Sequence, residues 1–434
     1  MAFKFISKAK LLLAIFAPCI LVWLTVNHAE DWKFKQLKLL KLSYQRAYWL
    51  MPPKVIDNRR RKSEVFQNND SEFTKQSKYE KSKKANFVET KLILAYTTVY
   101  GKLFTTELFR KKGEVNSIPD PFSKCDYKCK WSNNKAHYKR SDAVIFHLYN
   151  LDSIHKEDGH GEFAISNLPT RYSTDQKWVL MIREPGSFFY PQQLKLLDNK
   201  FNLTMTFQSD SDVVIPYGGY SKLSPSELEK YANIDYITGK SKMVAWLVSN
   251  CITSSRREDY VRELQKYMQV DVYGKCNSFN SSPGDQFMIA QNYKFYLAFE
   301  NSDCDDYITE KFWWMLSLGM IPVVRGERAN YRMFAPPNSY IHVDWFETPK
   351  ELAQHLIDVS LKPLLLQKYH QWRKTYRANF RRMPSNWYCD LCEKVHTSPP
   401  KTVDVYKHFS EDTRCNVFDR NRDRTGEQMQ NIEH

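Results

Sequence analysis

Residues 295–312 read FYLAFENSDCDDYITEKF. The apolar run at the start of this stretch has the composition of a strand buried on both faces, and it ends at Glu300. A helix is predicted soon afterwards, with Glu310 and Lys311 near its beginning. A buried strand that ends in polar side chains and leads into a helix is typical of a parallel α/β sheet, in which ligands bind at the carboxyl ends of the strands. This stretch therefore predicts both the fold class and the edge of the sheet that carries the function.

The segments around this stretch alternate strand and helix in the same way. Buried strands are predicted at 243–248, 270–274, 293–299, 321–324 and 340–343, with helices after 255, at 309–320 and from 348. Ser255 and Glu258 have the spacing of a capping box, and Pro349 follows Thr348 in the first turn of another helix. The alternation predicts a doubly wound parallel sheet in residues 226–400.

A first folded region precedes this one, from residue 91 to residue 225. Its clearest strands are continuous apolar runs at 143–149, 178–182 and 203–207. A cluster of proline and glycine between 216 and 225 marks the boundary between the two regions. A chain of 434 residues is long enough for two domains with cores of their own.

The N-terminal segment predicts a membrane anchor. Three lysines in residues 1–10 precede residues 11–26, LLLAIFAPCILVWLTV, which carry no charge. As a helix this run spans roughly 24 Å, which suits a thin membrane. The alternative is a cleaved signal peptide, but Asn27 stands where a small residue is needed for cleavage. The anchor interpretation places the basic N-terminus in the cytoplasm and the rest of the chain in the lumen.

Residues 27–90 form a basic stem. They hold 15 Lys or Arg against 8 Asp or Glu, about half of the net charge of +15. Basic clusters such as Arg59-Arg60-Arg61-Lys62 alternate there with Ser, Asn and Gln, and the segment shows little sign of a core. It is either a solvated stem or an arm that binds a polyanion.

The cysteines indicate an oxidising compartment. Eight lie outside the apolar N-terminal run, at Cys125, Cys129, Cys251, Cys276, Cys304, Cys389, Cys392 and Cys415. An even number in a lumenal protein predicts disulfides. The close pairs at 125/129 and 389/392 have, alternatively, the spacing of two halves of a zinc site. The absence of a histidine-rich partner pattern favours disulfides.

Three sequons agree with that compartment. They lie at Asn69, Asn202 and Asn280. Each predicts N-glycosylation on the surface of a protein of the secretory pathway.

Basic side chains lie at two of the predicted strand-to-helix junctions. Lys311 follows the quoted strand, and Arg256 and Arg257 follow the strand that ends in Ser249-Asn250. A helix N-terminus with Arg and Lys binds a diphosphate, because free N–H groups, the helix dipole and side-chain charge all act on the anion. The alternative for each residue taken singly is a solvated helix face. P-loop and dinucleotide-binding sites lose their usual support, because no G-x-x-x-x-G-K-[ST] or G-x-G-x-x-G run is present.

Two acidic motifs lie in the first region. Glu184 stands just past the strand at 178–182, where a carboxylate of suitable pKa deprotonates an acceptor hydroxyl; the alternative is a turn carboxylate with no catalytic role. Asp210 and Asp212 form an Asp-x-Asp triplet of the kind that binds a metal with a diphosphate. Asp and Ser also cap and turn chains, and we predict no metal site at this triplet.

The run YKFYLAFENSDCDDYITEKF (293–312), with IPVV after it and SYIHVDWF at 339–346, resembles the signature of the α1,3-fucosyltransferases of glycosyltransferase family 10. The resemblance extends over roughly residues 140–395 and includes AVIFH, DSDVVIPYG, VSN followed by Arg257, VDVYG, PKELAQHL and the late CDLC pair. It implies an α/β protein of GT-B type, with two Rossmann-like domains on a type II Golgi anchor and a stem. The acceptor-binding domain is then 91–225, the GDP-fucose-binding domain 226–400 and the C-terminal tail 401–434.

The resemblance also implies a reaction and its residues. The donor is GDP-β-L-fucose, and fucose is transferred with inversion in a single displacement. Glu184 is the general base, although its neighbours Ile182, Arg183 and Pro185 depart from the vertebrate-type Asn-Leu-Glu-Ser-Pro pattern. Arg257 and Lys311 neutralise the diphosphate as GDP leaves. The donor pocket is lined by Tyr217, Ser249, Asn250, Arg256, Tyr273, Asn301, Tyr307 and Glu310.

The same family resemblance bears on cofactors, disulfides and the acceptor. The fold is similar to metal-independent sugar transferases, and stimulation by a divalent cation would not by itself prove a bound metal. Family members tie the late cysteine pair to the start of the acceptor domain, which implies that Cys125 and Cys129 bond to Cys389 and Cys392; the remaining pairs are then Cys251 with Cys276 and Cys304 with Cys415. The sequences SNC, YGKC and ENSDC are more similar to invertebrate and core-type enzymes, which favours GlcNAc of N-glycans, above all the innermost one of the core.

Other functions remain as alternatives. One is a Lewis-type enzyme that acts on antennal GlcNAc, and another is a catalytically inactive, membrane-anchored sugar-binding protein on the same fold. A third is a polyanion-binding protein in which the basic stem is the functional part. The expected partners are GDP-fucose, glycoprotein N-glycans and the Golgi membrane, with no nucleic acid.

Overall fold

The computed structural model describes residues 89–100, 104, 121–151, 168–231, 234–276, 285–380 and 386–416. The predicted anchor, nearly all of the basic stem, and the sequons at Asn69 and Asn280 lie outside these residues. Within them, no helix has both the length and the apolar character that crossing a membrane requires.

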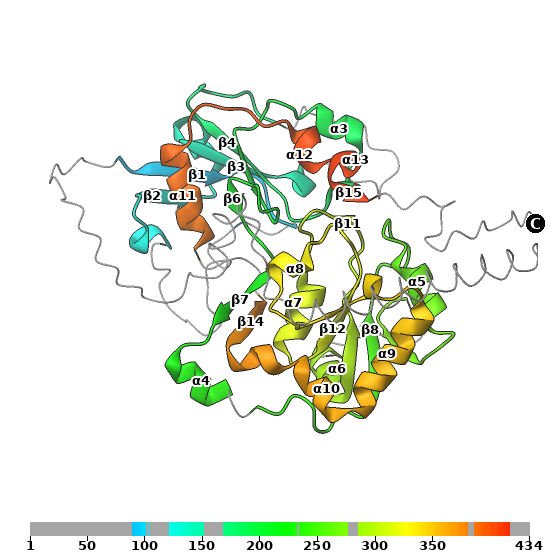
Figure 1. Ribbon diagram of the computed structural model, residues 1–434. Helices are drawn as coiled ribbons and strands as arrows, with labels where there is room; N and C mark the ends of the chain where they lie inside the picture. Colours follow the sequence, from blue (N-terminus) through cyan, green and yellow to red (C-terminus); the bar gives the residue numbers. More distant parts are fainter. Residues whose placement is uncertain are drawn as a thin grey trace, which may run out of the picture. The chain divides into compact units, whose positions relative to one another are not determined.

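The first region folds around a six-stranded sheet in which every neighbouring pair of strands is parallel (Figure 1). The order is β2 (Cys129–Ser132), β1 (Lys91–Ala95), β3 (Ala143–His147), β4 (Lys177–Met181), β5 (Leu203–Thr206) and β6 (Val213–Val214). The predicted runs at 143–149, 178–182 and 203–207 form the three central strands. Every residue of β3 and β5 is buried, as expected of strands covered on both faces.

The second region folds around a five-stranded parallel sheet. The order is β13 (Ile341–His342), β12 (Ile321–Val324), β10 (Tyr293–Leu297), β8 (Lys242–Leu247) and β9 (Val270–Tyr273). The helices between these strands are α5 (Arg257–Leu264), α6 (Asp285–Asn292), α7 (Glu310–Ser317) and α8 (Tyr331–Phe334), and α9 (Pro349–Leu361) and α10 (Pro363–Lys368) follow β13. All five predicted strands are present, and the parallel α/β class is confirmed.

Shorter elements complete the described chain. They are α3 (Pro191–Lys195), β7 (Gly218–Lys222), α4 (Pro225–Tyr231), β11 (Asp303–Cys304), β14 (Tyr376–Phe380), α11 (Trp387–Thr397), α12 (Val405–Phe409), α13 (Glu411–Arg414) and β15 (Cys415–Asn416). Single turns of 3-10 helix lie at Pro121–Lys124, Lys135–Arg140, Leu148–Asn150, Gly186–Phe188, Val343–Trp345 and Gln371–Lys374. Strand β7 pairs antiparallel with β14, far away in sequence.

The chain returns to the six-stranded sheet after the second region. Helix α11, orange in Figure 1, packs on this sheet and buries Trp387 and Leu391 in the same core as β1 and β3. Disulfides Cys125–Cys389 and Cys129–Cys392 fix it there. Our division of the sequence placed residues 387–400 in the donor-binding domain, but in space they pack on the first sheet. Burial of the apolar face of α11 explains this difference.

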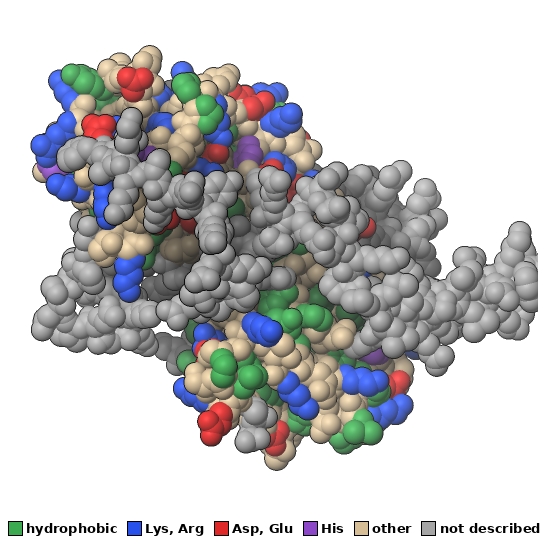
Figure 2. Space-filling view, turned by 60° about the vertical axis from the view of Figure 1, so that its left-hand side comes forward, with side chains coloured by type: hydrophobic (Ala, Val, Ile, Leu, Met, Phe, Trp, Pro, Cys, Tyr) green, Lys and Arg blue, Asp and Glu red, His purple; other side chains and the backbone are tan. Residues whose placement is uncertain are grey.

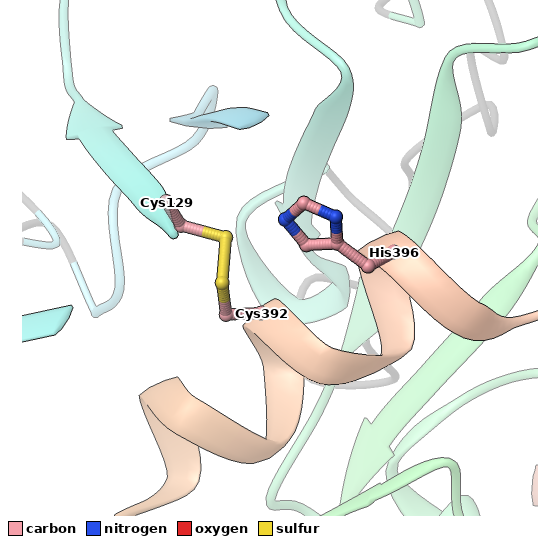
Figure 3. A group of neighbouring side chains, drawn as sticks. All are labelled: Cys129, Cys392 and His396. Atoms are coloured by element: carbon pink, nitrogen blue, oxygen red, sulfur yellow. A yellow bond between two sulfur atoms is a disulfide. The ribbon is translucent and has the colours of Figure 1, made fainter. Parts of the chain in front are cut away.

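All eight described cysteines form the predicted pairs. Cys251–Cys276 and Cys304–Cys415 accompany the two bonds of α11. His396 lies beside the Cys129–Cys392 disulfide, and its Nε2 is 3.0 Å from the Lys128 carbonyl oxygen (Figure 3). In this oxidised state neither sulfur is a thiolate, so the alternative of a zinc site on the close cysteine pairs does not hold.

The segment from Lys401 to Asn416, which we call the C-terminal strap, joins the two sheets. Val405 and Phe409 lie in the core of the first region, and Cys415 is bonded to Cys304 beyond β10. Arg414 contacts Asp210 at 2.6 Å and Asp305 at 3.2 Å, while Lys401 pairs with Asp212. Both acids of the Asp-x-Asp triplet therefore pair with basic side chains of the strap.

The predicted capping box at Ser255 is not present in the structure. Ser255 does not cap α5: its hydroxyl donates to the Glu300 carbonyl, and Arg256, in the left-handed region at φ 49°, precedes the helix instead. The predicted capping box is therefore wrong, because the long-range hydrogen bond to Glu300 takes the Ser255 hydroxyl from the local one.

The predicted glycosylation site at Asn202 lies within the described residues. The Asn202 amide accepts from the Trp178 N–H and donates to the Lys401 carbonyl, both at 2.8 Å, so a glycan on its Nδ2 would compete with the hydrogen bond to the C-terminal strap.

Gly218 and Gly219 in β7 provide a matched test of how this strand packs. A Cβ on Gly218 would lie 2.3 Å from Cγ of Trp313 in α7, whereas a Cβ on Gly219 would meet nothing within 4 Å. We expect Gly218→Ala to lower the free energy of unfolding by about 1–3 kcal/mol through overpacking. Gly219→Ala should change it by no more than about 0.5 kcal/mol. Urea unfolding of both variants measures the difference, and equal effects would contradict the packing of β7 on α7.

Candidate functional site

Glu184 lies in the turn that follows β4, at the carboxyl end of the first sheet. Its side chain is partly buried, and its Oε1 accepts a hydrogen bond of 2.7 Å from the Tyr100 hydroxyl. Burial raises the pKa of this carboxyl group above its ordinary value, while the Tyr100 bond and the charge of Lys311 oppose the rise. A carboxylate with a raised pKa is a stronger base, which is what removal of a hydroxyl proton requires.

The turn that carries Glu184 is held by Tyr217. The Tyr217 hydroxyl donates to the Arg183 carbonyl at 2.5 Å, and the Arg183 guanidinium stacks on the Tyr217 ring at 4.0 Å from its centroid. The ring also contacts Phe207 and Tyr307. Because Tyr217 fixes the residue before Glu184, it positions the acid as well as standing near the predicted donor pocket.

The quoted strand ends in a buried carboxylate that organises the second sheet's edge. Glu300 accepts hydrogen bonds from the Thr309 N–H at 2.8 Å and from its hydroxyl, and Thr309 caps α7. The Oε2 of Glu300 lies 3.2 Å from the Lys311 Nζ. Sequence reasoning noticed Glu300 only as a polar strand end; its structural role is to place the first turn of α7.

Lys311 is held as a cation at this helix N-terminus. Its Nζ lies between Glu300, Thr309 and Glu310, which it contacts at 3.0–3.2 Å. Burial alone would lower the pKa of the ammonium group, but the charges of Glu300 and Glu310 outweigh burial and raise it. A charged lysine at a helix N-terminus is an arrangement that suits a bound anion, which agrees with the predicted diphosphate contact.

The two arginines of the other junction differ in exposure. Arg257 is only 2% exposed, and its guanidinium donates to the carbonyls of Phe299 at 2.7 Å and Asn250 at 3.0 Å. Arg256 is partly exposed and pairs with Asp259 at 2.7 Å. Arg257 therefore ties the loop after β8 to the end of β10, which gives it a structural function besides its predicted contact with the diphosphate.

The remaining predicted donor residues gather around these two strand ends. Ser249 and Asn250 are exposed at the end of β8, whereas Tyr307 is buried against Tyr217 beside the Cys304–Cys415 disulfide. Tyr273 ends β9, and its hydroxyl lies 2.8 Å from that of Tyr293. The Asn301 Oδ1 is buried and has no hydrogen-bond partner in the described part of the chain. An unpaired acceptor at this edge fits a hydroxyl donor on a bound ligand.

Three serine hydroxyls connect the loops that follow β4, β8 and β10. The Ser302 hydroxyl, just beyond Glu300, lies 2.5 Å from that of Ser187, which follows Glu184 by three residues, and 3.1 Å from that of Ser254. The charges of both Lys311 and Glu310 act on Glu184. The acid of the first sheet and the cation of the second therefore belong to one site. Tyr100 and Ser187 were missed from the sequence, because nothing local distinguishes them from other polar residues.

Both folded regions of the chain are similar to known proteins. The model "Glycosyltransferase family 10 (fucosyltransferase) C-term" matches residues 237–411, and "Fucosyltransferase, N-terminal" matches 88–218. A 3-galactosyl-N-acetylglucosaminide 4-alpha-L-fucosyltransferase of Bos taurus is 37% identical over 278 residues, 62% of this chain and 71% of the relative. The chain belongs to glycosyltransferase family 10. It is therefore a fucosyltransferase that uses GDP-fucose, and the resemblance to α1,3-fucosyltransferases is confirmed.

Other family 10 members extend this comparison. Glycoprotein 3-alpha-L-fucosyltransferase A of Drosophila melanogaster is 39% identical over 237 residues, which cover 53% of this chain and 46% of that protein. A crystal structure of an alpha1,3-fucosyltransferase aligns with 73% of this chain and 92% of its own, at 15% identity and a TM-score of 0.44. The two family models, at residues 88–218 and 237–411, cover both sheets of the chain.

The contrast between the two arginines leads to a stability test. Arg257→Ala would remove the buried guanidinium that bonds the Phe299 carbonyl, the Asn250 carbonyl and Glu258, and we expect it to lower the free energy of unfolding by about 2–4 kcal/mol. Arg256→Ala removes a partly exposed ion pair and should cost less than about 1 kcal/mol. Thermal and urea unfolding of the two variants compare them directly. Equal stability losses would show that Arg257 does not hold the two strand ends together.

Proposed function

We propose that this family 10 enzyme, in a GT-B arrangement, transfers L-fucose with inversion from GDP-β-L-fucose to the 3-hydroxyl of GlcNAc on N-glycans. The observation that carries the proposal is the hydrogen bond of 2.5 Å between the hydroxyls of Ser187 and Ser302, which brings the turn that carries Glu184 to the strand end that holds Lys311. An inverting transfer needs a base on one side of the anomeric carbon and a stabilised leaving group on the other.

The proposed displacement proceeds in one step. The acceptor hydroxyl gives its proton to Glu184 as its oxygen bonds to the anomeric carbon of fucose. The bond from that carbon to the β-phosphate oxygen breaks, and GDP leaves with the electron pair. Lys311 and the α7 N–H groups neutralise the charge that grows on the diphosphate, and they do so without rearranging, since Glu300 and Thr309 already fix them.

The proposed acceptor is the innermost GlcNAc of the N-glycan core. Its support is the cysteine placement in SNC, YGKC and ENSDC, together with the similarity to a Drosophila enzyme named a glycoprotein 3-alpha-L-fucosyltransferase. Antennal GlcNAc is the second candidate, and the similarity to a bovine galactosyl-N-acetylglucosaminide fucosyltransferase favours it. A glycan panel distinguishes the two.

The test of the reaction uses the lumenal part of the chain, residues 27–434, with GDP-fucose and N-glycans that carry either the core alone or antennae. We expect fucose on the 3-hydroxyl of the core GlcNAc, identified by linkage analysis. Glu184→Gln should lower kcat by roughly 10²–10⁴-fold, as expected for loss of a general base. Lys311→Ala should lower it by roughly 10²–10³-fold, since a fixed charge on the leaving group is lost.

A matched control accompanies these variants. Lys266→Ala removes an exposed lysine that pairs with Glu263, and its activity should equal that of the parent. Fucose found only on antennal GlcNAc would replace the core assignment. Full activity of Glu184→Gln would show that another group is the base, and folded protein inactive on every acceptor would favour the sugar-binding alternative.

The pH dependence of the reaction follows from the raised pKa of Glu184. The base acts when it is ionised, so kcat/KM should rise with pH through that raised pKa. The acid limb of the profile should therefore lie above the ordinary glutamate pKa of about 4.3. A profile whose acid limb falls at or below that ordinary value would contradict a buried Glu184 as the base.

We further propose that the chain is a single-pass type II protein of the Golgi membrane, with both sheets lumenal. The four disulfides support an oxidising compartment, and the apolar run at residues 11–26 supports an anchor. The full chain should stay with membranes on alkaline extraction, and protease should reach residues 91–416 only after the membrane is opened. Release by alkali would favour a cleaved signal peptide.

A further inference from the structure

Tyr100 contacts the Glu184 carboxylate directly. It follows β1, 84 positions before Glu184, and its hydroxyl lies 2.7 Å from Oε1. Among the described residues this is the one hydrogen bond that the Glu184 side chain makes, so its Oε2 has no partner in that part of the chain. One carboxylate oxygen is thus held, and the other is left for a ligand.

The Tyr100 hydroxyl is fixed in the role of donor. Tyr100 is 47% exposed as a residue, but loss of water around its hydroxyl raises the pKa of the phenol above its ordinary value, and the charge of Glu184 raises it further. The phenol therefore stays protonated wherever Glu184 is ionised. A neutral phenol that donates to a carboxylate stabilises the ionised form and orients it.

The backbone at Tyr100 is held in a conformation that this residue adopts rarely. Its φ is 50°, in the left-handed region, which costs a non-glycine residue roughly 1 kcal/mol or more. The Asn150 side chain compensates, because its Oδ1 accepts from the Tyr100 N–H at 2.8 Å and lies 2.7 Å from Nδ1 of the buried His147. The Tyr100 ring packs edge-on against the His147 ring, with 4.9 Å between centroids.

Strain of this kind persists where the surroundings impose it, and it concentrates at functional sites. His147 and Asn150 lie at and beyond the carboxyl end of β3, next to β4, whose end carries Glu184. The strained backbone therefore places the Tyr100 hydroxyl at the carboxyl end of the sheet, next to Glu184.

We infer that Tyr100 is a positioning residue for the base: its hydroxyl holds Oε1 of Glu184 so that Oε2 takes the proton of the acceptor hydroxyl. This inference rests on the proposed role of Glu184. It goes beyond the residues that sequence reasoning assigned to the reaction, and it gives the Asn150, His147 and Tyr100 group a function in setting the strength of the base.

The inference has a consequence for the pH profile. The phenol stabilises the ionised carboxylate, so it opposes the rise in pKa that burial causes. Removing the hydroxyl takes away one of the interactions that oppose burial, so the pKa of Glu184 moves higher, although the charges of Lys311 and Arg183 still lower it. The acid limb of kcat/KM then moves to higher pH, which a merely structural tyrosine would not produce.

The experiment compares Tyr100→Phe with Tyr138→Phe in the enzyme assay. Tyr138 also makes one phenol hydrogen bond, to the Thr170 carbonyl at 2.8 Å, in the same region but away from Glu184. For Tyr100→Phe we expect kcat at neutral pH to fall roughly 10- to 100-fold, an acid limb at higher pH and an unchanged KM for GDP-fucose. Tyr138→Phe should keep the parent profile.

A second variant keeps the test decisive if Tyr100→Phe does not fold. Asn150→Ala retains the phenol but releases the Tyr100 backbone, and it should move the acid limb in the same direction by a smaller amount. An acid limb that stays in place in the folded variants, with Glu184→Gln inactive, overturns the inference and leaves the proposed function standing. Full activity of Glu184→Gln removes the proposed base and the inference with it.

Discussion

The site depends on one buried carboxylate, that of Glu300. With its side chain 2% exposed, this group must find partners inside the protein, and it finds three in the Thr309 N–H, the Thr309 hydroxyl and the Lys311 ammonium. Because a buried charge left unpaired costs several kcal/mol, these contacts fix the turn between β10 and α7. The same constraint holds Lys311 charged at a helix N-terminus before any ligand binds, so the anion site is organised in advance.

The two sheets are joined by polar and covalent contacts. Ser302 contacts Ser187 and Ser254, and Ser209 contacts Asp306 with its N–H and hydroxyl at 3.0 and 2.6 Å. The C-terminal strap adds the Cys304–Cys415 disulfide directly beside these loops. Basic and acidic side chains are interspersed over the coloured parts of the face shown in Figure 2.

Much of this arrangement follows from the sequence. The apolar runs of β3, β4, β5, β8 and β10 predicted parallel sheets, because strands buried on both faces have no polar alternation. The polar residues after β4, β8 and β10 predicted the functional edge, because parallel strands place their carboxyl ends together. The domain boundary at residue 400 left α11 with the second sheet, although the disulfides that the family resemblance implied already tied Cys389 and Cys392 to the first region.

The sequence by itself determined the family, the parallel α/β class and the strand ends that carry Glu184, Arg257 and Lys311, because periodicity and motifs are local properties. The family resemblance also implied that Cys125 and Cys129 bond to Cys389 and Cys392, but not which bonds which. Only the tertiary structure decided which polar groups meet. In the structure Tyr100 donates a hydrogen bond to Glu184, Glu300 contacts Lys311, and the buried Arg257 donates to backbone carbonyls. Hydrogen bonds between residues tens of positions apart depend on how the strands align in space, and no local pattern records that alignment.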